Sequence, residues 1–158
     1  MVVPGRPRGD LPGGTVSLLF TDIEGSTQLL RRLGPLYAGV QENHRRLLRD
    51  VFSRFDGREV DTQGDAFMVA FQSAHNAVSA AAEIQRQLAA APWPDGAEVR
   101  VRIGIHTGQP ERGSEGYVGI DVVRAARICS VAHGGQVVVS EATREIVAEA
   151  GTETIDLG

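Results

Sequence analysis

Apolar and polar residues alternate in two stretches of the chain, with the two-residue period of a strand. The first stretch runs from Thr15 to Asp22 and the second from Glu98 to His106. Their alternating apolar residues are Val16, Leu18 and Phe20 in the first, and Val99, Val101, Ile103 and Ile105 in the second. Because successive side chains of a strand point to opposite faces, the alternation predicts two strands that each bury one face.

Apolar residues recur at helical spacing in five other stretches. The predicted helices are a short one from about residue 28, a long one over 34–56, an alanine-rich one over 74–91, one near 120–132, and a short one from 141. Gly25, Ser26 and Thr27 supply turn and N-cap residues for the first of these. Pro92 and Pro94 end the alanine-rich helix, because proline lacks the amide donor.

Three short apolar segments complete the predicted elements. Residues 57–62 (GREVDT) and 65–71 (DAFMVAF) are separated by Gln63 and Gly64, which predicts a hairpin. Residues 135–140 (GQVVVS) predict a last strand, and a glycine-rich loop precedes the helix near 120. Residues 1–14, rich in Pro and Gly, predict a disordered leader, which leaves 15–158 as one folded domain.

The order strand, helix, hairpin, helix, strand predicts an α+β fold. It is the ferredoxin-like βαββαβ arrangement, an antiparallel sheet core with an appended helix and strand. In this topology the first and third of the long strands lie side by side and antiparallel at the centre of the sheet. A Rossmann fold is disfavoured, because two consecutive strands here are joined by a hairpin rather than by a helix.

Two aspartates are brought to one edge of this sheet. Asp22 ends the first strand, and Asp65 begins the strand that runs back beside it. Asp22 shares strand parity with Phe20 and Asp65 with Phe67, which we interpret as consistent with one shared site. Two such carboxylates predict a site for two Mg²⁺ or Mn²⁺ ions with substrate phosphates as further ligands. Taken singly, either aspartate is also typical of a turn.

The segment after Asp22 predicts a phosphate site. Ile23, Glu24, Gly25, Ser26 and Thr27 lie between the first strand and the first helix. Gly25 permits close approach of the backbone, and a helix N-terminus presents free amides and the positive end of its dipole to an anion. No lysine follows the glycine, so the segment is not a Walker loop. We also expect the Ile23 carbonyl to join the metal ligands.

Composition excludes several classes of partner. The 158-residue chain carries a formal net charge of −4, without the basic footprint of a nucleic-acid binder, and the acidity also argues against a membrane surface. No stretch is long and apolar enough to cross a bilayer. The one cysteine, Cys129, cannot form an internal disulfide and fits a reducing compartment. We therefore expect a soluble, cytoplasmic protein.

Several blocks of the sequence resemble a known family. They are FTDIEGST, DTQGDAFMVAF, VRIGIHTG, YVGIDVVRAARI and GGQVVVS. In this order and spacing they are similar to the class III adenylate and guanylate cyclase catalytic domain, in particular to the versions in actinobacterial regulators. The resemblance covers roughly Val16 to Asp156. It implies conversion of ATP or GTP to the 3′,5′-cyclic nucleotide and pyrophosphate, two Mg²⁺ or Mn²⁺ ions, and a head-to-tail homodimer with shared active sites.

The resemblance assigns roles to individual residues. Asp22 and Asp65 match the metal-binding aspartates, and Ile23 matches the carbonyl ligand. Arg127 matches the arginine that stabilises the transition-state phosphate, a role that suits a guanidinium beside developing negative charge. We expect Cys129 to lie in the core and assign no role to His106.

Three positions depart from the family pattern. Asp61 stands where the family has a base-reading lysine, and Gly116 stands at the partner position, usually Asp or Thr. Val123 replaces the asparagine one helical turn before the arginine, and valine donates no hydrogen bond. The chain also ends at Gly158, where the family usually continues into a hairpin with a triphosphate-binding lysine. We therefore expect an excised domain of a longer regulator, with a linked effector domain, or a truncated member.

Two main hypotheses follow. The first is a nucleotidyl cyclase with weak or non-standard activity, because the base-selecting and asparagine positions are replaced. The second is a catalytically silent module that binds nucleotide or dimerises and regulates an effector domain. A diguanylate cyclase is disfavoured, because QGDAF matches a GGDEF hairpin poorly. The sequence does not identify the preferred base.

Overall fold

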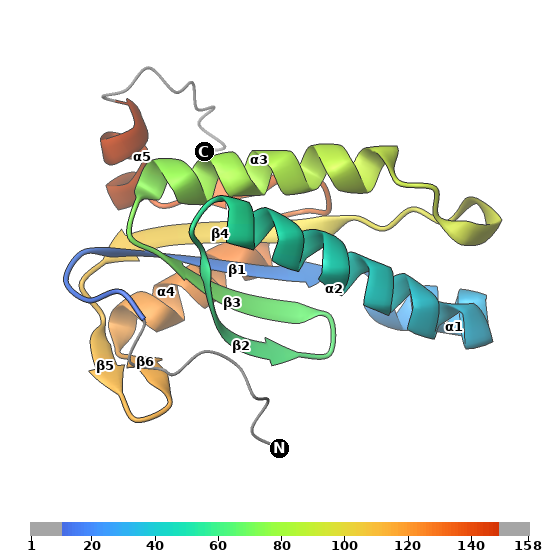
Figure 1. Cartoon of the computed structure of the whole chain (residues 1–158), viewed down its shortest axis with the longest axis horizontal. Coiled ribbons are helices and arrows are strands. Elements are labelled where there is room, and N and C mark those ends of the chain that lie inside the picture. Colours follow the sequence, from blue (N-terminus) through green and yellow to red (C-terminus); the bar gives the residue numbers. More distant parts are fainter. Residues whose placement is uncertain (1–10, 149–158) are drawn as a thin grey trace.

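A five-stranded sheet forms the centre of the protein in a computed structural model that describes residues 11–148 (Figure 1). The strand order is β2-β3-β1-β4-β7. The strands of this sheet are β1 (Val16–Ile23), β2 (Arg58–Gln63), β3 (Ala66–Phe71), β4 (Val101–Gly108) and β7 (Val137–Val139). Residues 1–10 of the predicted leader and everything after residue 148, where a last hairpin was expected to be missing, lie outside the described residues.

The helices follow the predicted order. They are α1 (Ser26–Leu33), α2 (Tyr37–Arg54), α3 (Ala74–Ala90), α4 (Ile120–Val131) and α5 (Glu141–Ala148), with 3-10 turns η2 (Gly34–Leu36) and η3 (Pro94–Gly96). The stretch expected to be one helix from residue 34 therefore begins as a 3-10 turn. Pro35 fits there, because the first turn of a helix needs no amide donor.

The predicted topology of the sheet is confirmed. β1 pairs antiparallel with β3 on one side and with β4 on the other, so it lies at the sheet centre. β2 and β3 form the expected hairpin, and β7 joins β4 in parallel. In the β1–β4 register, Asp22 lies opposite Arg102. The α+β class and its mostly antiparallel sheet therefore agree with the prediction.

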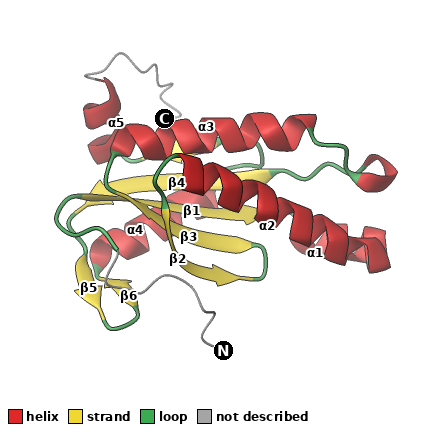
Figure 2. Ribbon diagram, in the orientation of Figure 1, coloured by secondary structure: helices red, strands yellow, loops and turns green. Residues whose placement is uncertain are grey.

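Helices cover both faces of the sheet (Figure 2). α2 and α3 pack on one face, over a core that includes Leu19, Ile23, Phe67 and Val69. α4 packs on the opposite face with Leu18, Met68, Tyr117 and Ala125. Odd-numbered residues of β1 thus face α2 and α3, whereas even-numbered residues face α4, as the alternation requires.

The glycine-rich loop before α4 contains a hairpin that the sequence did not predict. Its strands are β5 (Glu111–Gly113) and β6 (Gly116–Val118), and together they form a second, two-stranded sheet. The Tyr117 hydroxyl donates to the Pro12 carbonyl at 2.5 Å, and Leu11 is buried in the core beneath α4. The folded part therefore begins by residue 11, four residues before the predicted boundary.

α4 approaches the sheet very closely at one glycine. A Cβ on Gly104, in the middle of β4, would lie 2.3 Å from the backbone nitrogen of Cys129. Only glycine lets the helix backbone contact the strand at this distance. Cys129 is buried there, as expected, and burial raises the pKa of its thiol to about 11. No helix within residues 11–148 is long and apolar enough to cross a membrane.

Candidate functional site

The candidate site lies where β1 ends beside the β2–β3 turn. Asp65, in that turn, accepts a hydrogen bond at Oδ2 from the backbone amide of Ile23 at 2.6 Å. Ile23 is the last residue of β1 and follows Asp22 directly. The structure therefore brings the Asp65 carboxylate to the chain segment that carries Asp22, as the topology predicts.

Asp22 is held by an arginine that the sequence reasoning missed. Arg102 Nε donates to Asp22 Oδ1 and Nη2 donates to Oδ2, both at 2.7 Å, in a bidentate ion pair. Each side chain is 29% exposed, so the pair is partly shielded from water. These hydrogen bonds raise the pKa of the Arg102 guanidinium above its ordinary value. In the register of β1 and β4 the two residues lie opposite one another, and this register is the signal that would have found Arg102.

The argument from strand parity was wrong. Asp22 follows the even-numbered residues of β1 that face α4, whereas Asp65 has the parity of Phe67 and Val69, which face α2 and α3. The two aspartates nevertheless converge, because Asp65 precedes the first residue of β3 and its side chain turns along the edge to Ile23. They meet at the rim of the sheet rather than on one face.

The oxygen donors at this rim suit a hard divalent cation. Asp65 Oδ1 accepts no hydrogen bond from another described residue, while Arg102 engages both oxygens of Asp22. Within residues 11–148, no three His, Cys, Asp or Glu side chains are grouped as a metal site. A cation here would therefore need backbone, water or phosphate oxygens besides the two carboxylates, which is the ligand set that Mg²⁺ favours.

The segment after β1 presents a helix N-terminus. Gly25 precedes α1 in the left-handed conformation (φ 67°) and makes no side-chain cap, and Leu29 N donates to Gly25 O at 3.0 Å. This is the first bond of the helix, so the amides of Ser26 and Thr27 precede the hydrogen-bonded turns. They have the arrangement expected for a phosphate.

Glu24 differs from its neighbours in this segment. Its amide donates to the Arg100 carbonyl at 2.8 Å, which continues the edge of the sheet. Its carboxylate lies 3.9 Å from His133 Nδ1, beside the loop after α4. Glu24 thus offers the predicted phosphate site neither its amide nor a suitable charge, and the site reduces to Gly25, Ser26 and Thr27.

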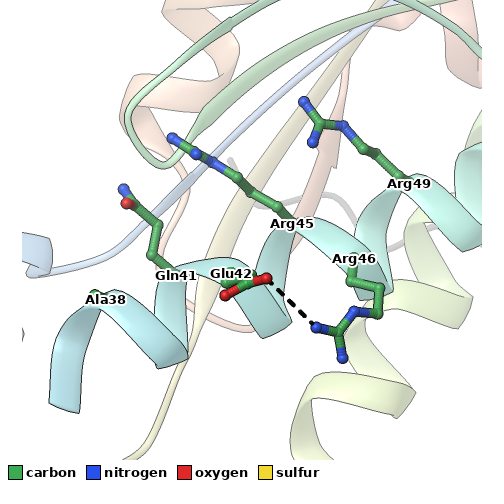
Figure 3. Close-up of a pocket in the computed structure, with 6 residues that line it drawn as sticks. All are labelled: Ala38, Gln41, Glu42, Arg45, Arg46 and Arg49. Atoms are coloured by element: carbon green, nitrogen blue, oxygen red, sulfur yellow. Dashed lines mark ion pairs between the residues drawn. The ribbon is translucent and has the colours of Figure 1, made fainter.

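An arginine of α2 holds the turn that carries Asp65. Arg45 donates through Nε to the Gly64 carbonyl at 3.0 Å and also through Nη2. Its side chain projects from α2 and helps to line a cavity of about 520 Å³ (Figure 3). Burial and the nearby Asp65 charge raise the pKa of Tyr37, at the start of α2. α2 is therefore tied by Arg45 to the residue next to a candidate metal ligand.

The two positions that the resemblance assigns to base selection are near one another, because Gly116 lies against the residue next to Asp61. Gly116, at the start of β6, has φ 125°, and a Cβ there would lie 2.8 Å from Val60 Cγ1. Val60 is the neighbour of Asp61 at an irregularity of β2. The Asp61 carboxylate accepts from Thr62 N at 2.9 Å and from Gln63 Nε2 at 3.0 Å, so local hydrogen bonds hold it. Gly116 cannot be replaced by a larger family residue without moving Val60.

Arg127 forms no ion pair with either of the two aspartates. It lies on the exposed side of α4, one helical turn after Val123, and makes no ion pair within the described part of the chain. Val123 is 43% exposed, and nearby Ile120 and Val118 are 59% and 51% exposed. These three residues form an exposed apolar strip beside Arg127. The structure thus brings Asp65 to the segment that carries Asp22 but pairs Arg127 with neither carboxylate.

Comparison with known proteins gives a consistent picture. A family model described as the adenylate and guanylate cyclase catalytic domain matches residues 11–158. Receptor-type adenylate cyclase B of Leishmania donovani is 37% identical over 177 aligned positions, which cover 85% of this chain and 13% of that protein. An uncharacterised protein of Mycobacterium tuberculosis is 36% identical over 152 positions, covering 93% of this chain and 51% of its own.

Solved structures share the fold. One from Trypanosoma brucei, described as an adenylate cyclase in its monomeric state, superposes with a TM-score of 0.80 at 31% identity. The match covers 90% of this chain and 79% of that one. The chain spans about half the length of the mycobacterial relative and a small part of the Leishmania one.

Proposed function

The chain belongs to the adenylate and guanylate cyclase catalytic domain family, and we propose that it cyclises ATP or GTP with divalent cations. In this reaction the 3′-hydroxyl oxygen of the nucleotide forms a bond to the α-phosphorus. The bond from that phosphorus to the bridging oxygen of the β-phosphate breaks, pyrophosphate leaves, and the hydroxyl proton passes to water. The products are a 3′,5′-cyclic nucleotide and pyrophosphate.

The carboxylates of Asp22 and Asp65 would hold the ions, together with the Ile23 carbonyl. When bound, two Mg²⁺ or Mn²⁺ ions supply positive charge that stabilises the attacking and leaving oxygens of an in-line displacement. The hydrogen bond from Ile23 N to Asp65 Oδ2, at 2.6 Å, is the observation on which this proposal rests. It holds the Asp65 carboxylate against the backbone of Ile23, the residue after Asp22.

Arg102 balances the charge of Asp22 in the structure. To hold a metal ion, Asp22 would have to give up part of its ion pair with Arg102. Arg102 would then remain beside the triphosphate as a cation and stabilise phosphate charge. The amides of Ser26 and Thr27 and the dipole of α1 bind phosphate oxygens on the adjoining side.

Arg127 completes the site from a second copy of the chain. It is exposed on α4 and pairs with neither aspartate of its own chain, so we assign it to the metal-binding edge of the partner in a head-to-tail homodimer. There it stabilises charge that develops on the phosphate. We expect weak or poorly base-selective activity, because Asp61, Gly116 and Val123 lack the family side chains. We also propose a cytoplasmic location, which suits the buried free thiol of Cys129.

The metal assignment is tested by nucleotide binding. Asp22→Asn and Asp65→Asn remove one charge each at nearly constant shape, and we expect Mn²⁺-dependent binding of ATP and GTP to weaken at least about tenfold. Asp56→Asn is the matched control, because Asp56 is exposed in a left-handed turn that asparagine tolerates. Titration calorimetry with and without Mn²⁺ measures the effect. Unchanged affinity in both site variants would remove the assignment.

Catalysis itself is tested by product formation. Purified dimer with Mn²⁺ or Mg²⁺ and either nucleotide should release cyclic product, separated by chromatography. If a dimer that binds nucleotide forms no product at high concentration, the alternative holds, namely a silent module that regulates a linked effector domain. Replacement of the asparagine position by Val123 favours that alternative, and the retained Asp22, Asp65 and Arg127 oppose it.

The replaced asparagine position gives a separate prediction. Val123→Asn restores a hydrogen-bond donor one turn before Arg127, so kcat should rise by about 10- to 100-fold if the side chain reaches the ribose of the substrate. Ile146→Asn adds the same group at an exposed apolar residue of α5, outside α4, and should leave kcat unchanged. Equal rates for Val123→Asn and the unaltered protein would place residue 123 outside the site.

A further inference from the structure

His106 makes two side-chain hydrogen bonds inside the protein. It lies on β4 and is only 5% exposed. Its Nε2 lies 2.8 Å from Asp121 Oδ1, in the first turn of α4, and its Nδ1 lies 2.8 Å from Ser140 Oγ, just before α5. One buried imidazole therefore connects the central sheet to the beginnings of two helices.

The hydrogen-bond donors in this network can be assigned by counting. Ser140 Oγ accepts from the Thr143 amide at 3.3 Å, as an N-cap residue does, so its own proton is available for His106 Nδ1. The Asp121 carboxylate can only accept, so His106 Nε2 carries the proton of the other bond and donates it to Asp121 Oδ1. From Thr143 the hydrogen bonds continue through Thr107 to Ser17, and the hydroxyl oxygens of each pair lie 2.8 Å apart. The network is thereby satisfied throughout, which favours one rigid arrangement.

The three residues Ser140, His106 and Asp121 are not arranged for nucleophilic attack. The Ser140 hydroxyl is engaged by both His106 and the Thr143 amide, and His106 is buried. A nucleophile must be free to reach a substrate. The network therefore has a positioning role.

Asp121 is fixed from a second direction. Its Oδ2 accepts from the Gln109 amide at 3.1 Å, just after β4. A Cβ on Gly108 would lie 2.4 Å from the Asp121 carboxyl carbon, so glycine leaves the space that this carboxylate fills. At the start of α4, Gly119 supplies no side-chain cap. Asp121 is therefore the polar anchor of this helix end, where its charge also suits the helix dipole.

α4 carries Arg127 six residues after Asp121, roughly 9 Å along the helix axis. We propose that the His106–Asp121 clamp sets the position of α4 and thereby the place at which Arg127 meets the metal-binding edge of the partner subunit. This inference rests on the proposed function and identifies His106 and Asp121 as positioning residues. Neither needs to touch the nucleotide.

A heterodimer with one working site tests this proposal. One subunit carries Arg127→Ala and keeps its metal aspartates. The other carries Asp22→Ala and Asp65→Ala and keeps Arg127, and two different affinity tags isolate the mixed dimer. Its single complete site takes metals from the first subunit and the arginine from the second. Product from this dimer tests the proposed function by itself.

Asp121→Asn is then placed in either subunit. In the subunit that supplies Arg127 we expect kcat to fall about 10- to 100-fold, the size expected for misplacing a catalytic group by about 1 Å. In the subunit that supplies the metals we expect less than a twofold change. A substitution that only weakened folding would act equally in both places. Equal effects, or no effect in the arginine subunit, would overturn the clamp.

Glu141→Gln is the matched control. Glu141 is also an acid in the first turn of a helix, but it is exposed and, among the described residues, pairs only with Arg144 at 3.7 Å. It should leave kcat unchanged in either subunit. Hydrogen exchange on the homodimer gives a readout without catalysis: Asp121→Asn should speed exchange in 119–127 more than in β1. Unchanged exchange in that segment would contradict the clamp even if the heterodimer made no product.

Discussion

His44 is a buried polar side chain without a hydrogen-bond partner. It is fully buried on α2, and neither ring nitrogen has a partner within the described part of the chain. Its ring lies 6.0 Å from that of Phe67, measured between centroids. Burial, and then the neighbouring charge of Arg45, lower the pKa of His44 from 6.5 to about 4. The folded protein therefore resists protonation of this residue.

This shift predicts a pH-dependent stability. Between pH 6.5 and 4 the unfolded chain binds the proton that folded His44 refuses, so the free energy of unfolding rises with pH. The full stability is present above pH 6.5, and about 3 kcal/mol is lost as pH falls to 4. Denaturant unfolding from pH 4 to 7.5 measures the slope. His44→Leu should flatten it, and His133→Gln, which removes an exposed imidazole, should not. The same slope in His44→Leu would refute the assignment.

The residues of the candidate site differ in how far the sequence alone could predict them. Asp22 and Asp65 were found because strand order alone determines which edges meet. Arg102 was not, because its significance depends on the register of β1 against β4, which alternation does not specify. The parity argument failed because it treated Asp65 as a strand residue, whereas a turn residue is free to aim its side chain along the sheet edge.

Among the elements, the long strands and helices follow from periodicity, whereas the short strands β5 and β6 do not. β1 and β4 have eight residues each, enough to show alternation. β5 and β6 have three residues each, too few to show a period, and Gly113 and Gly116 within them favour a loop. Their pairing depends on tertiary contacts, including the Tyr117 hydroxyl on Pro12.

Alanine substitutions at two glycines should change the free energy of unfolding in opposite directions, because only one of the glycines lies in the contact between α4 and β4. Gly104→Ala places a methyl group against the Cys129 backbone and should lower the free energy of unfolding by about 1–3 kcal/mol. Gly39→Ala, on the exposed side of α2 with no atom within 4 Å of the new Cβ, should raise it by about 0.5–1 kcal/mol. Urea unfolding compares the two. A stable Gly104→Ala would mean that α4 moves freely on the sheet.

The link from α2 to the hairpin predicts a difference between adjacent arginines. Arg45→Lys keeps the charge but loses the forked contact with Gly64, so the turn that carries Asp65 should loosen and Mn²⁺ affinity should fall about 2- to 5-fold. Arg46→Lys is the control, because within residues 11–148 Arg46 pairs only with exposed Glu42. Calorimetry measures the affinity and hydrogen exchange at Ile23 measures the turn. Equal values for both variants would show that Arg45 is not needed there.

At the scale of the whole molecule, the parts of the proposed site lie on different elements. The oxygen ligands gather at the edge formed by β1 and the β2–β3 turn, whereas Arg127 lies on the exposed side of α4. Beside Arg127 run Val118, Ile120 and Val123, which are 43–59% exposed although they are apolar. Two copies placed head to tail would cover this strip and bring each Arg127 to the other copy's ligands. The proposed chemistry therefore depends on association.

That dependence gives a prediction for the assembled protein. Specific activity should fall on dilution as dimers dissociate, and light scattering over the same concentrations should follow the loss. Ile120→Asp puts a charge into the apolar strip, so it should favour the monomer and lower activity at least about tenfold while leaving the fold intact. Leu36→Asp is the control, because Leu36 is similarly exposed (46%) but lies on η2, away from α4. Full activity from a monomeric Ile120→Asp protein would require Arg127 to reach the aspartates of its own chain. That outcome would overturn the assignment of Arg127 to the partner's site.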